Sequence, residues 1–368
     1  MSSPASPLVD VVVPVHSTTR PVGRAVASVV AGGLPVAAPD AAPRAGAVRI
    51  TVVCHNIGAE PIRDCLRPEH RSLVELVEWA DDTTNPAGAR NLGLERSTGR
   101  YVSFLDSDDA LAPGALAAWV RTAERHGSDA VLPPLVRDTG RPVRTPVPRP
   151  LRRADLDPVR DRLAYRTHAF GLLRRAALLR VGARFDGGHA TGEDQEFVAR
   201  TWFGGGRLDL APRAAAYVLH EGAADRISGA ARPLAADLAA ACGLLGGSWF
   251  AGLEEARRTA IAAKVLRVQF FAAVQARSGQ WSPEDARACR EFTALVGSVA
   301  APALEVLSRA DRDVLELAVR PDASAAGIAA ASARRRRFGR PATLLTRDPR
   351  RLLHREAPPR FMAASLMV

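Results

Sequence analysis

Lysine is nearly absent from this chain of 368 residues. Lys264 is the only lysine, and the other 49 of the 50 Lys and Arg residues are arginines. The formal net charge of +11 at pH 7 would by itself suggest a nucleic-acid partner. Because the arginines come with abundant Ala, Gly and Pro, the charge follows the amino-acid usage of a GC-rich genome, and no nucleic-acid partner is expected. An attraction to anionic substrates or membrane surfaces stays open.

Cysteines are few, and long apolar runs are missing. The four cysteines lie far apart without a C-x-x-C pair, which argues against a zinc site or a disulfide framework and predicts a reducing, cytoplasmic setting. The N-terminus has no basic segment followed by an apolar one, as a signal peptide would. The longest apolar stretch, 234–253, is interrupted by Asp237, so we expect a packed helix there and no membrane span.

The most informative segment is an apolar run at 101–105, followed by three carboxylates, Asp106, Asp108 and Asp109. The run predicts a buried strand, and ligands of open α/β sheets bind where such strands end. Side-chain alternation would place Asp106 and Asp108 on one side, where two oxygen ligands suit Mg²⁺ or Mn²⁺. Asp109 would point away and cap the next helix. The alternative is a solvated acidic turn.

The segments before this run predict a mostly parallel α/β sheet. β-branched residues predict strands buried on both faces, and apolar residues at helical spacing predict the helices between them, the first of which could be capped by the hydroxyl groups of residues 17 and 18. Strand, helix and strand at this spacing predict right-handed parallel connections. The expected strands are 9–15, 48–53, 73–79 and 101–105, and the expected helices begin near residues 21 and 87.

Three motifs resemble the family 2 glycosyltransferases of the GT-A fold. They are Val-Val-Val-Pro-Val-His at 11–16, Ala-Arg-Asn-x-Gly-Leu at 89–94 and Gly-Arg-Tyr-Val-x-Phe-Leu-Asp-Ser-Asp-Asp at 99–109. The resemblance covers about residues 8–230 and implies the Rossmann-like nucleotide-diphospho-sugar transferase fold. It also implies a nucleotide-sugar donor, a divalent metal (Mn²⁺ or Mg²⁺) and inversion at the anomeric carbon. We therefore expect a catalytic domain over 1–232.

The resemblance gives roles to single residues. It implies that the donor is bound by Pro14, His16, Asn56, Arg90, Asp106, Arg226 and Ser228, and the metal by Asp108, Asp106 and His220. Arg90 lies near a helix start, where anions are favoured, so we expect it to contact the pyrophosphate; an ordinary ion pair is the alternative. His220 follows a strand expected at 215–219, and a lone histidine there is otherwise structural.

One motif departs from the family pattern. The family's Asp-Asp-Gly-Ser after the second strand, whose aspartate reads uracil, is replaced here by Cys-His-Asn-Ile-Gly at 54–58. Asn56 can still hydrogen-bond a base edge, so a UDP-sugar is expected with weaker uridine selectivity than the family implies. Asp82 is the candidate for supplying the missing carboxylate contact.

A second acidic pair, Glu193-Asp194, follows a glycine-containing loop and precedes an apolar helix. Acids in a first helical turn are common as partners of the helix dipole. The spacing from the metal motif, however, resembles the family's Glu-Asp pair, in which the aspartate is the catalytic base. Asp194 would then take the proton of the acceptor hydroxyl, and Glu193 would orient the acceptor or support the loop.

The remaining segments differ in amino-acid composition. A Pro/Arg-rich segment at 137–153 is expected to be a loop on the acceptor side. From residue 233 the chain is rich in Ala, Leu and Arg at helical spacing, which predicts a helical domain over 233–325 that packs on the catalytic domain or forms a homo-oligomer. The segment 326–368 is expected to be a basic, flexible tail. Its run Arg334–Arg337 is either a solvated face or a contact with anionic groups of an acceptor or a membrane.

The sequence therefore predicts a metal-dependent inverting glycosyltransferase, in the cytoplasm or at the inner face of the membrane. Its acceptor would be a hydroxyl group of a cell-surface polysaccharide, a glycolipid or a lipid-linked saccharide. A nucleotidyltransferase is one alternative, although the first loop at 14–20 has no glycine to cradle phosphates. A non-catalytic nucleotide-sugar-binding or scaffold protein is another, and the Glu193-Asp194 pair argues against it.

Overall fold

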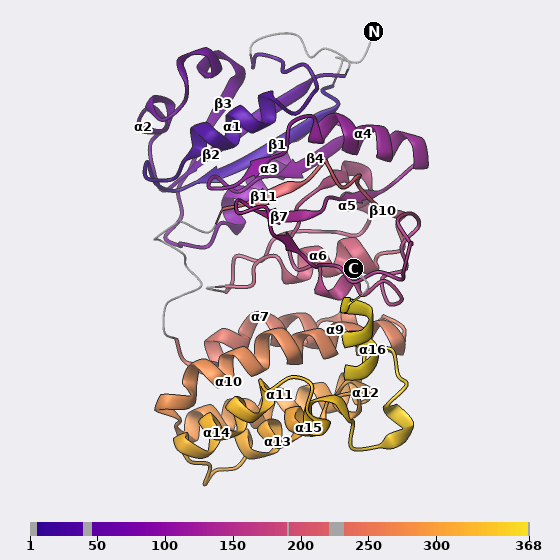
Figure 1. Cartoon of the computed structure of the whole chain (residues 1–368). Coiled ribbons are helices and arrows are strands. Elements are labelled where there is room, and N and C mark those ends of the chain that lie inside the picture. The colour runs from indigo at the N-terminus through magenta and orange to yellow at the C-terminus, as the bar shows by residue number, and fades with distance from the viewer. Residues whose placement is uncertain (1–5, 40–45, 190, 221–231, 367–368) are drawn as a thin grey trace.

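The computed structural model describes residues 6–39, 46–189, 191–220 and 232–366. An α/β half, drawn from indigo through magenta to pink-red, is followed by a helical half in orange and yellow (Figure 1). This order agrees with the sequence-based expectation of a catalytic α/β region followed by helices. Within the described residues, no helix combines the length and the apolar character that crossing a membrane requires.

The main sheet of the α/β half has seven strands in the order β10-β6-β9-β4-β1-β2-β3. β1 pairs in parallel with both β2 and β4, whereas β9 runs antiparallel to β4 and β6. The mostly parallel sheet is therefore confirmed. Its strands are β1 (Val9–Val15), β2 (Val48–His55), β3 (Val74–Trp79), β4 (Tyr101–Phe104), β6 (Ala130–Leu132), β9 (Leu172–Arg174) and β10 (Leu208–Leu210).

Helices cover both faces of this sheet because the β1 side chains alternate between two cores. Val11 and Val13 pack with residues of α1 and α4 in one core, and Val12 packs with residues of α3 and α6 in the other. α1 begins after Pro21 without a side-chain cap, so the expected capping by hydroxyl groups of residues 17 and 18 is wrong. The helices of this half are α1 (Val22–Val30), α2 (Ala59–Asp64), α3 (Ala87–Arg96), α4 (Ala115–His126), α5 (Arg175–Arg180) and α6 (Gln195–Phe203).

A second, smaller sheet has the order β5-β11-β7-β8. Its strands are β5 (Ala110–Leu111), β7 (Leu135–Arg137), β8 (Pro142–Val143) and β11 (Tyr217–Leu219). β5 pairs with β11 and follows β4 after five residues. The acidic turn at 106–109 is therefore held between the end of a main-sheet strand and the start of a strand in the second sheet.

The helical half continues to the end of the described chain. α9 passes into α10 through a π turn at Leu266–Phe270, and serine caps with matching aspartates begin α11 and α13. Its helices are α7 (Leu234–Gly246), α8 (Ser248–Ala251), α9 (Glu255–Val265), α10 (Phe271–Arg277), α11 (Pro283–Ala300), α12 (Pro302–Glu305), α13 (Arg309–Ala318), α14 (Ala325–Arg335), α15 (Pro341–Leu344) and α16 (Pro358–Leu366).

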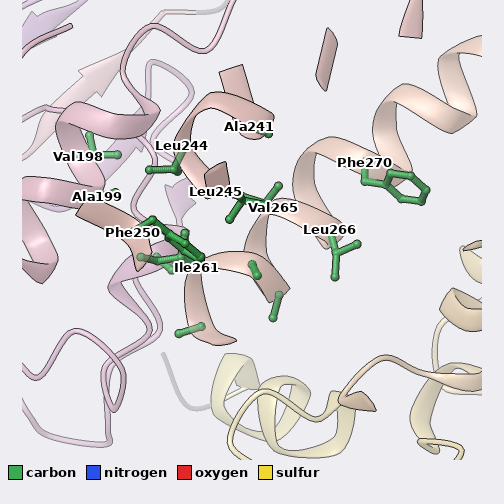
Figure 2. Packing of buried hydrophobic residues seen from close by; sticks show 14 of the residues in the cluster. Val198, Ala199, Ala241, Leu244, Leu245, Phe250, Ile261, Val265, Leu266 and Phe270 are labelled. Carbon is green, nitrogen blue, oxygen red and sulfur yellow. The ribbon is translucent and has the colours of Figure 1, made fainter. Parts of the chain in front are cut away.

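One apolar core joins the two halves. Figure 2 shows Val198 and Ala199 of α6 beside Leu244 and Leu245 of α7, with Ile261 of α9 below them in this view. The same cluster of buried residues extends from β1 and β4 of the main sheet to α14. A change from sheet to helices therefore marks the division near residue 232, and the apolar core is continuous across it.

The structure differs from the flexible tail expected at 326–368. Helices α14, α15 and α16 form most of its described part, and Ile328 of α14 is fully buried. Arg335 lies 2.6 Å from an Asp311 oxygen and stacks over the ring of Phe271. The arginine run predicted a solvated segment, but it ends a helix, where positive charge is favoured, and the alanines before it supply a face that can be buried.

Candidate functional site

Three carboxylates converge in the turn after β4. Ligand oxygens of Asp106, Asp108 and Asp109 all lie within 4.8 Å of one another, which is close enough to hold one metal ion. The expectation that Asp109 points away from the other two is wrong, because β4 ends at Phe104 and strand alternation does not extend into the turn. Such a set of hard oxygen ligands fits Mg²⁺ or Mn²⁺.

Asp109 does not cap a helix, because α4 begins only at Ala115. Its buried carboxylate accepts hydrogen bonds from the Tyr217 hydroxyl (3.0 Å) and from the His220 main-chain N–H (2.8 Å). Burial and the neighbouring Asp106 raise the pKa of Asp109 to about 7. Asp109 thus ties the end of β11 to the acidic turn and brings His220 beside it.

Two arginines pair with the other carboxylates of the turn. Arg20 Nη1 lies 2.5 Å from Asp108 Oδ2, and Arg24 donates to the main-chain oxygen of Asp108. Arg90 Nη2 lies 2.7 Å from Asp106 Oδ1, and its Nη1 lies 2.7 Å from Glu193 Oε1. Arg90 therefore connects the acidic turn to the second acidic pair, a role that the sequence did not indicate.

Arg90 is 8% exposed, so its charge depends on these partners. Burial alone would lower the pKa of Arg90, but the carboxylates of Asp106 and Glu193 raise it above its usual range. The guanidinium is thus held as a cation between two acids that are far apart in sequence. The expected contact with a pyrophosphate stays a prediction.

Glu193 and Asp194 lie immediately before α6. Asp194 occupies the N-cap position but makes no capping hydrogen bond with its side chain, so the purely structural interpretation lacks its main contact. Its Oδ2 lies 3.6 Å from His168 Nδ1. Asp194 instead lines a cavity of about 460 Å³ together with Glu193, Arg90 and the acidic turn. We call this space the acidic cavity; its wall also includes Arg20, Pro86, Phe104, His168, Ala169, Phe170, Thr191, Gly192, Leu219 and His220.

The chain's single lysine lies close to this cavity. Lys264 of α9 is 4% exposed, and burial lowers its pKa to about 8, while the negative charge of Asp194 acts in the opposite direction. The helical half therefore places one buried amine within electrostatic range of Asp194. Sequence reasoning missed it, because no catalytic constellation was visible in that half.

The polar residues after β2 form a separate network. Asn56 has a positive φ of 55°; its Nδ2 donates to the Thr83 main-chain oxygen (2.8 Å), and its Oδ1 accepts from the Asp81 N–H (2.8 Å). His55 Nε2 lies 2.8 Å from Asp81 Oδ1. Burial raises the pKa of Asp81, but the hydrogen bonds from His55 and its neighbours outweigh this and lower it below its usual range. Asp81, rather than the exposed Asp82, belongs to this network: its main-chain N–H binds Asn56, and its carboxylate binds His55.

The other predicted donor residues are distributed as follows. Pro14 is buried in β1, and His16 is exposed just beyond the end of that strand. Arg226 and Ser228 lie outside the described residues. The structure thus brings together Arg90, Asp106, Asp108, Glu193, Asp194 and His220 in the acidic cavity, while Asn56 belongs to the network around Asp81.

Residues 60–182 match the family model of glycosyl transferase family 2. This match lies within the α/β half of the chain. Succinoglycan biosynthesis protein ExoM of Rhizobium meliloti is 32% identical over 179 residues, which are 45% of this chain and 55% of that protein. ExoO of the same organism is 30% identical over 160 residues, 40% of this chain and 46% of that protein. The chain spans about half the length of these curated relatives.

The fold of the chain resembles a solved structure. S. aureus TarS 1–349 in complex with UDP-GlcNAc superposes with a TM-score of 0.72 at 18% identity, over 88% of this chain and 90% of that chain. The same protein in complex with UDP gives a TM-score of 0.70. A match of this extent includes the helical half. The expected GT-A fold followed by a helical region is therefore confirmed.

Proposed function

We propose that this chain is a metal-dependent, inverting glycosyltransferase that moves a sugar from a nucleotide-diphosphate donor to a hydroxyl acceptor. The observation that carries the proposal is the acidic cavity, in which Arg90 links the acidic turn to the Glu193-Asp194 pair. Holding the metal at the donor and taking a proton from the acceptor require different acids. The acidic cavity is lined both by the acids of the turn and by the Glu193-Asp194 pair. Matches to family 2 support the same reaction class.

Asp106 and Asp108 are the residues that would hold the metal, with His220 beside them. The fit rests on the convergence of three carboxylates in the turn. Burial, and after it the negative charge of Asp106, raises the pKa of Asp109 there. A divalent cation bound there supplies positive charge that offsets the charge of a departing nucleoside diphosphate. Arg20 and Arg90 keep the two carboxylates oriented.

Asp194 is the proposed base. As the acceptor oxygen forms its bond to the anomeric carbon and the bond to the diphosphate breaks, the hydroxyl proton passes to an Asp194 oxygen. A single displacement of this kind inverts the anomeric configuration. Asp194 is suited to the task because it lines the cavity and its side chain makes no capping bond, and Glu193 is held beside it by Arg90.

A UDP-sugar is the proposed donor, supported by the UDP-GlcNAc and UDP complexes of TarS. A saccharide acceptor, free or lipid-linked, is supported by the names of the two succinoglycan biosynthesis relatives. The proposed setting is the cytoplasm, and it is supported by free thiols at Cys54, Cys65, Cys242 and Cys289.

The test is incubation of the full chain with a panel of nucleotide sugars and Mn²⁺, followed by mass spectrometry and by NMR of the anomeric product. Sugar hydrolysis or transfer with inversion supports the proposal. Pyrophosphate release indicates a nucleotidyltransferase, and binding without turnover indicates a scaffold. Asp322→Asn, an exposed carboxylate distant in sequence from the site, is the matched control for acid substitutions.

A further inference from the structure

A second cavity, of about 600 Å³, lies between the β7–β8 hairpin and the Pro/Arg-rich segment that follows it. It shares no lining residue with the acidic cavity. We call it the basic groove, because its described lining combines apolar side chains and prolines with five arginines and contains no acid. The arginines are Arg144, Arg149, Arg152, Arg153 and Arg213.

Three of these arginines have no carboxylate partner in the described part of the chain. Arg149 pairs with the buried Asp161 (2.7 Å), and Arg152 pairs with Asp155 (2.9 Å). Arg144 and Arg153, by contrast, donate only to main-chain oxygens, those of Ser365 and Ala211, and Arg213 makes no ion pair within the described residues. The groove therefore concentrates positive charge that the protein itself does not neutralise.

Arg153 and Arg213 are near enough to influence each other. Burial and the positive charge of Arg213 both lower the pKa of Arg153. Like charges placed together without an acid cost free energy unless an anion joins them. An anionic ligand at this position would relieve that repulsion.

Leu151 gives the groove an apolar tip. Its side chain is 101% exposed, and its φ of 63° is uncommon for a residue with a side chain. Pro150 and Arg152 on either side are also exposed. Arginines around an exposed leucine and prolines are the pattern of a surface that places apolar groups among lipid chains and cations among headgroups.

We propose that the basic groove and Leu151 bind the surface of an anionic phospholipid membrane. The arginines without partners contact lipid phosphates, and Leu151 enters the boundary between headgroups and acyl chains. Charge complementarity and the exposed apolar tip together favour this partner, because a small soluble anion would gain nothing from Leu151. The proposal does not depend on the transferase activity, since it uses other residues and another cavity.

The arginine run at 334–337, which the sequence singled out, is a weaker candidate for the same contact. Arg335 is already paired with Asp311 and stacked on Phe271, whereas Arg336 and Arg337 are exposed beside Phe338, which is 77% exposed, so this segment is the rival surface that the experiment has to separate from the basic groove. These two residues provide a control with the same change in net charge.

The experiment is flotation of the full chain with vesicles made of equal parts of phosphatidylcholine and phosphatidylglycerol, and with vesicles of phosphatidylcholine alone. We expect binding to the anionic vesicles only, weakened by salt. The double variant Arg153→Gln, Arg213→Gln should bind about 25-fold more weakly, since each arginine near an anionic surface contributes about fivefold. Leu151→Ser should lower binding about fivefold at unchanged charge.

The control double variant Arg336→Gln, Arg337→Gln should stay within about twofold of the wild type. Equal loss in both double variants would show an unspecific effect of net charge and overturn the proposal. Absence of flotation by the wild type would overturn it as well, as would inorganic pyrophosphate binding to the groove without any binding to vesicles. Donor binding measured by calorimetry on the same variants checks that the fold and the acidic cavity are intact.

Discussion

The arginines of the acidic cavity and those of the basic groove differ in their pairing with acids. In the acidic cavity, five acids meet two arginines, and both arginines pair with carboxylates. In the basic groove, five arginines meet no acid among the described lining residues. Arginine in the first site orients negative groups that can attract a cation, and in the second it leaves positive charge available to an anion. A net charge of +11 for the chain conceals this division.

The largest effect is expected from the acid of the cavity that is proposed to take a proton. Asp194→Asn keeps the shape of the side chain but removes its basicity, so single-turnover transfer should fall by about 10²–10⁴-fold while donor affinity holds. Asp322→Asn should leave both unchanged. Near-normal transfer by the Asp194 variant would contradict its role as the base and leave Glu193 as the candidate.

Substitution of an acid in the turn should weaken donor binding. Asp108→Asn removes a proposed metal ligand. Losing a residue that only hydrogen-bonds to a metal ligand already lowers metal affinity by about 10–100-fold. The Mn²⁺-dependent affinity for a UDP-sugar should therefore fall by more than about 100-fold in this variant. Calorimetry with and without Mn²⁺ measures this change. An affinity in the Asp108 variant equal to the wild type would remove the metal assignment.

Arginines of the two sites should differ in their effect on stability. Arg90→Gln leaves Asp106 and Glu193 without their partner, and the free energy of unfolding should fall by about 3 kcal/mol. Arg213→Gln removes a repelled charge and should change it by less than about 0.5 kcal/mol. Urea unfolding of both variants tests the contrast, and equal losses would contradict it.

Lys264 predicts a pH dependence of stability. Its pKa is near 8 in the folded protein, against the usual lysine value of 10.5 expected for the unfolded chain. The unfolded chain therefore binds more protons between these values, and stability rises with pH across this window. Lys264→Met should remove that rise and stabilise the protein below pH 8 by about 1–3 kcal/mol. The measurement is the difference between variant and wild type in urea unfolding at several pH values. A constant difference across the window would refute the assignment.

The smallest effect concerns the selectivity for the nucleobase of the donor. With Asn56 bound to the loop at 81–83, uridine selectivity is expected to be modest. Competition by UDP, GDP, CDP and TDP against a bound UDP-sugar measures it. A preference for UDP of more than about 100-fold would show that a carboxylate such as Asp81 or Asp82 reads the base after all.

Local patterns were sufficient to predict the framework of the site. The β-branched and apolar runs predicted β1 to β4, and the acids directly after β4 predicted an acidic turn at the end of a strand, because both depend on neighbours in sequence. Asp109 was misjudged because its partners, Tyr217 and His220, lie more than a hundred residues away. The pairing of Arg20 with Asp108 and that of Asp81 with His55 also depend on tertiary contacts that no periodicity reveals.

In the helical half, too, sequence patterns could not predict features that depend on tertiary contacts. Periodicity correctly predicted helices at 234–319, since each buries an apolar face. It could not predict that α14 follows them, because an alanine-rich segment ending in four arginines resembles a solvated tail until its partners Asp311 and Phe271 are known. The charge asymmetry between the two cavities is likewise invisible in composition, since it depends on which arginines meet an acid.

Lys264 also makes this protein chemically unusual. With one lysine in 368 residues, an amine-reactive reagent has a single side-chain target, and that target is buried in α9 near the loop of Asp194. The rate at which such a reagent labels Lys264 therefore measures how often the packing around this side chain opens. Mass spectrometry of one peptide would follow that opening, because no surface lysine competes for the reagent.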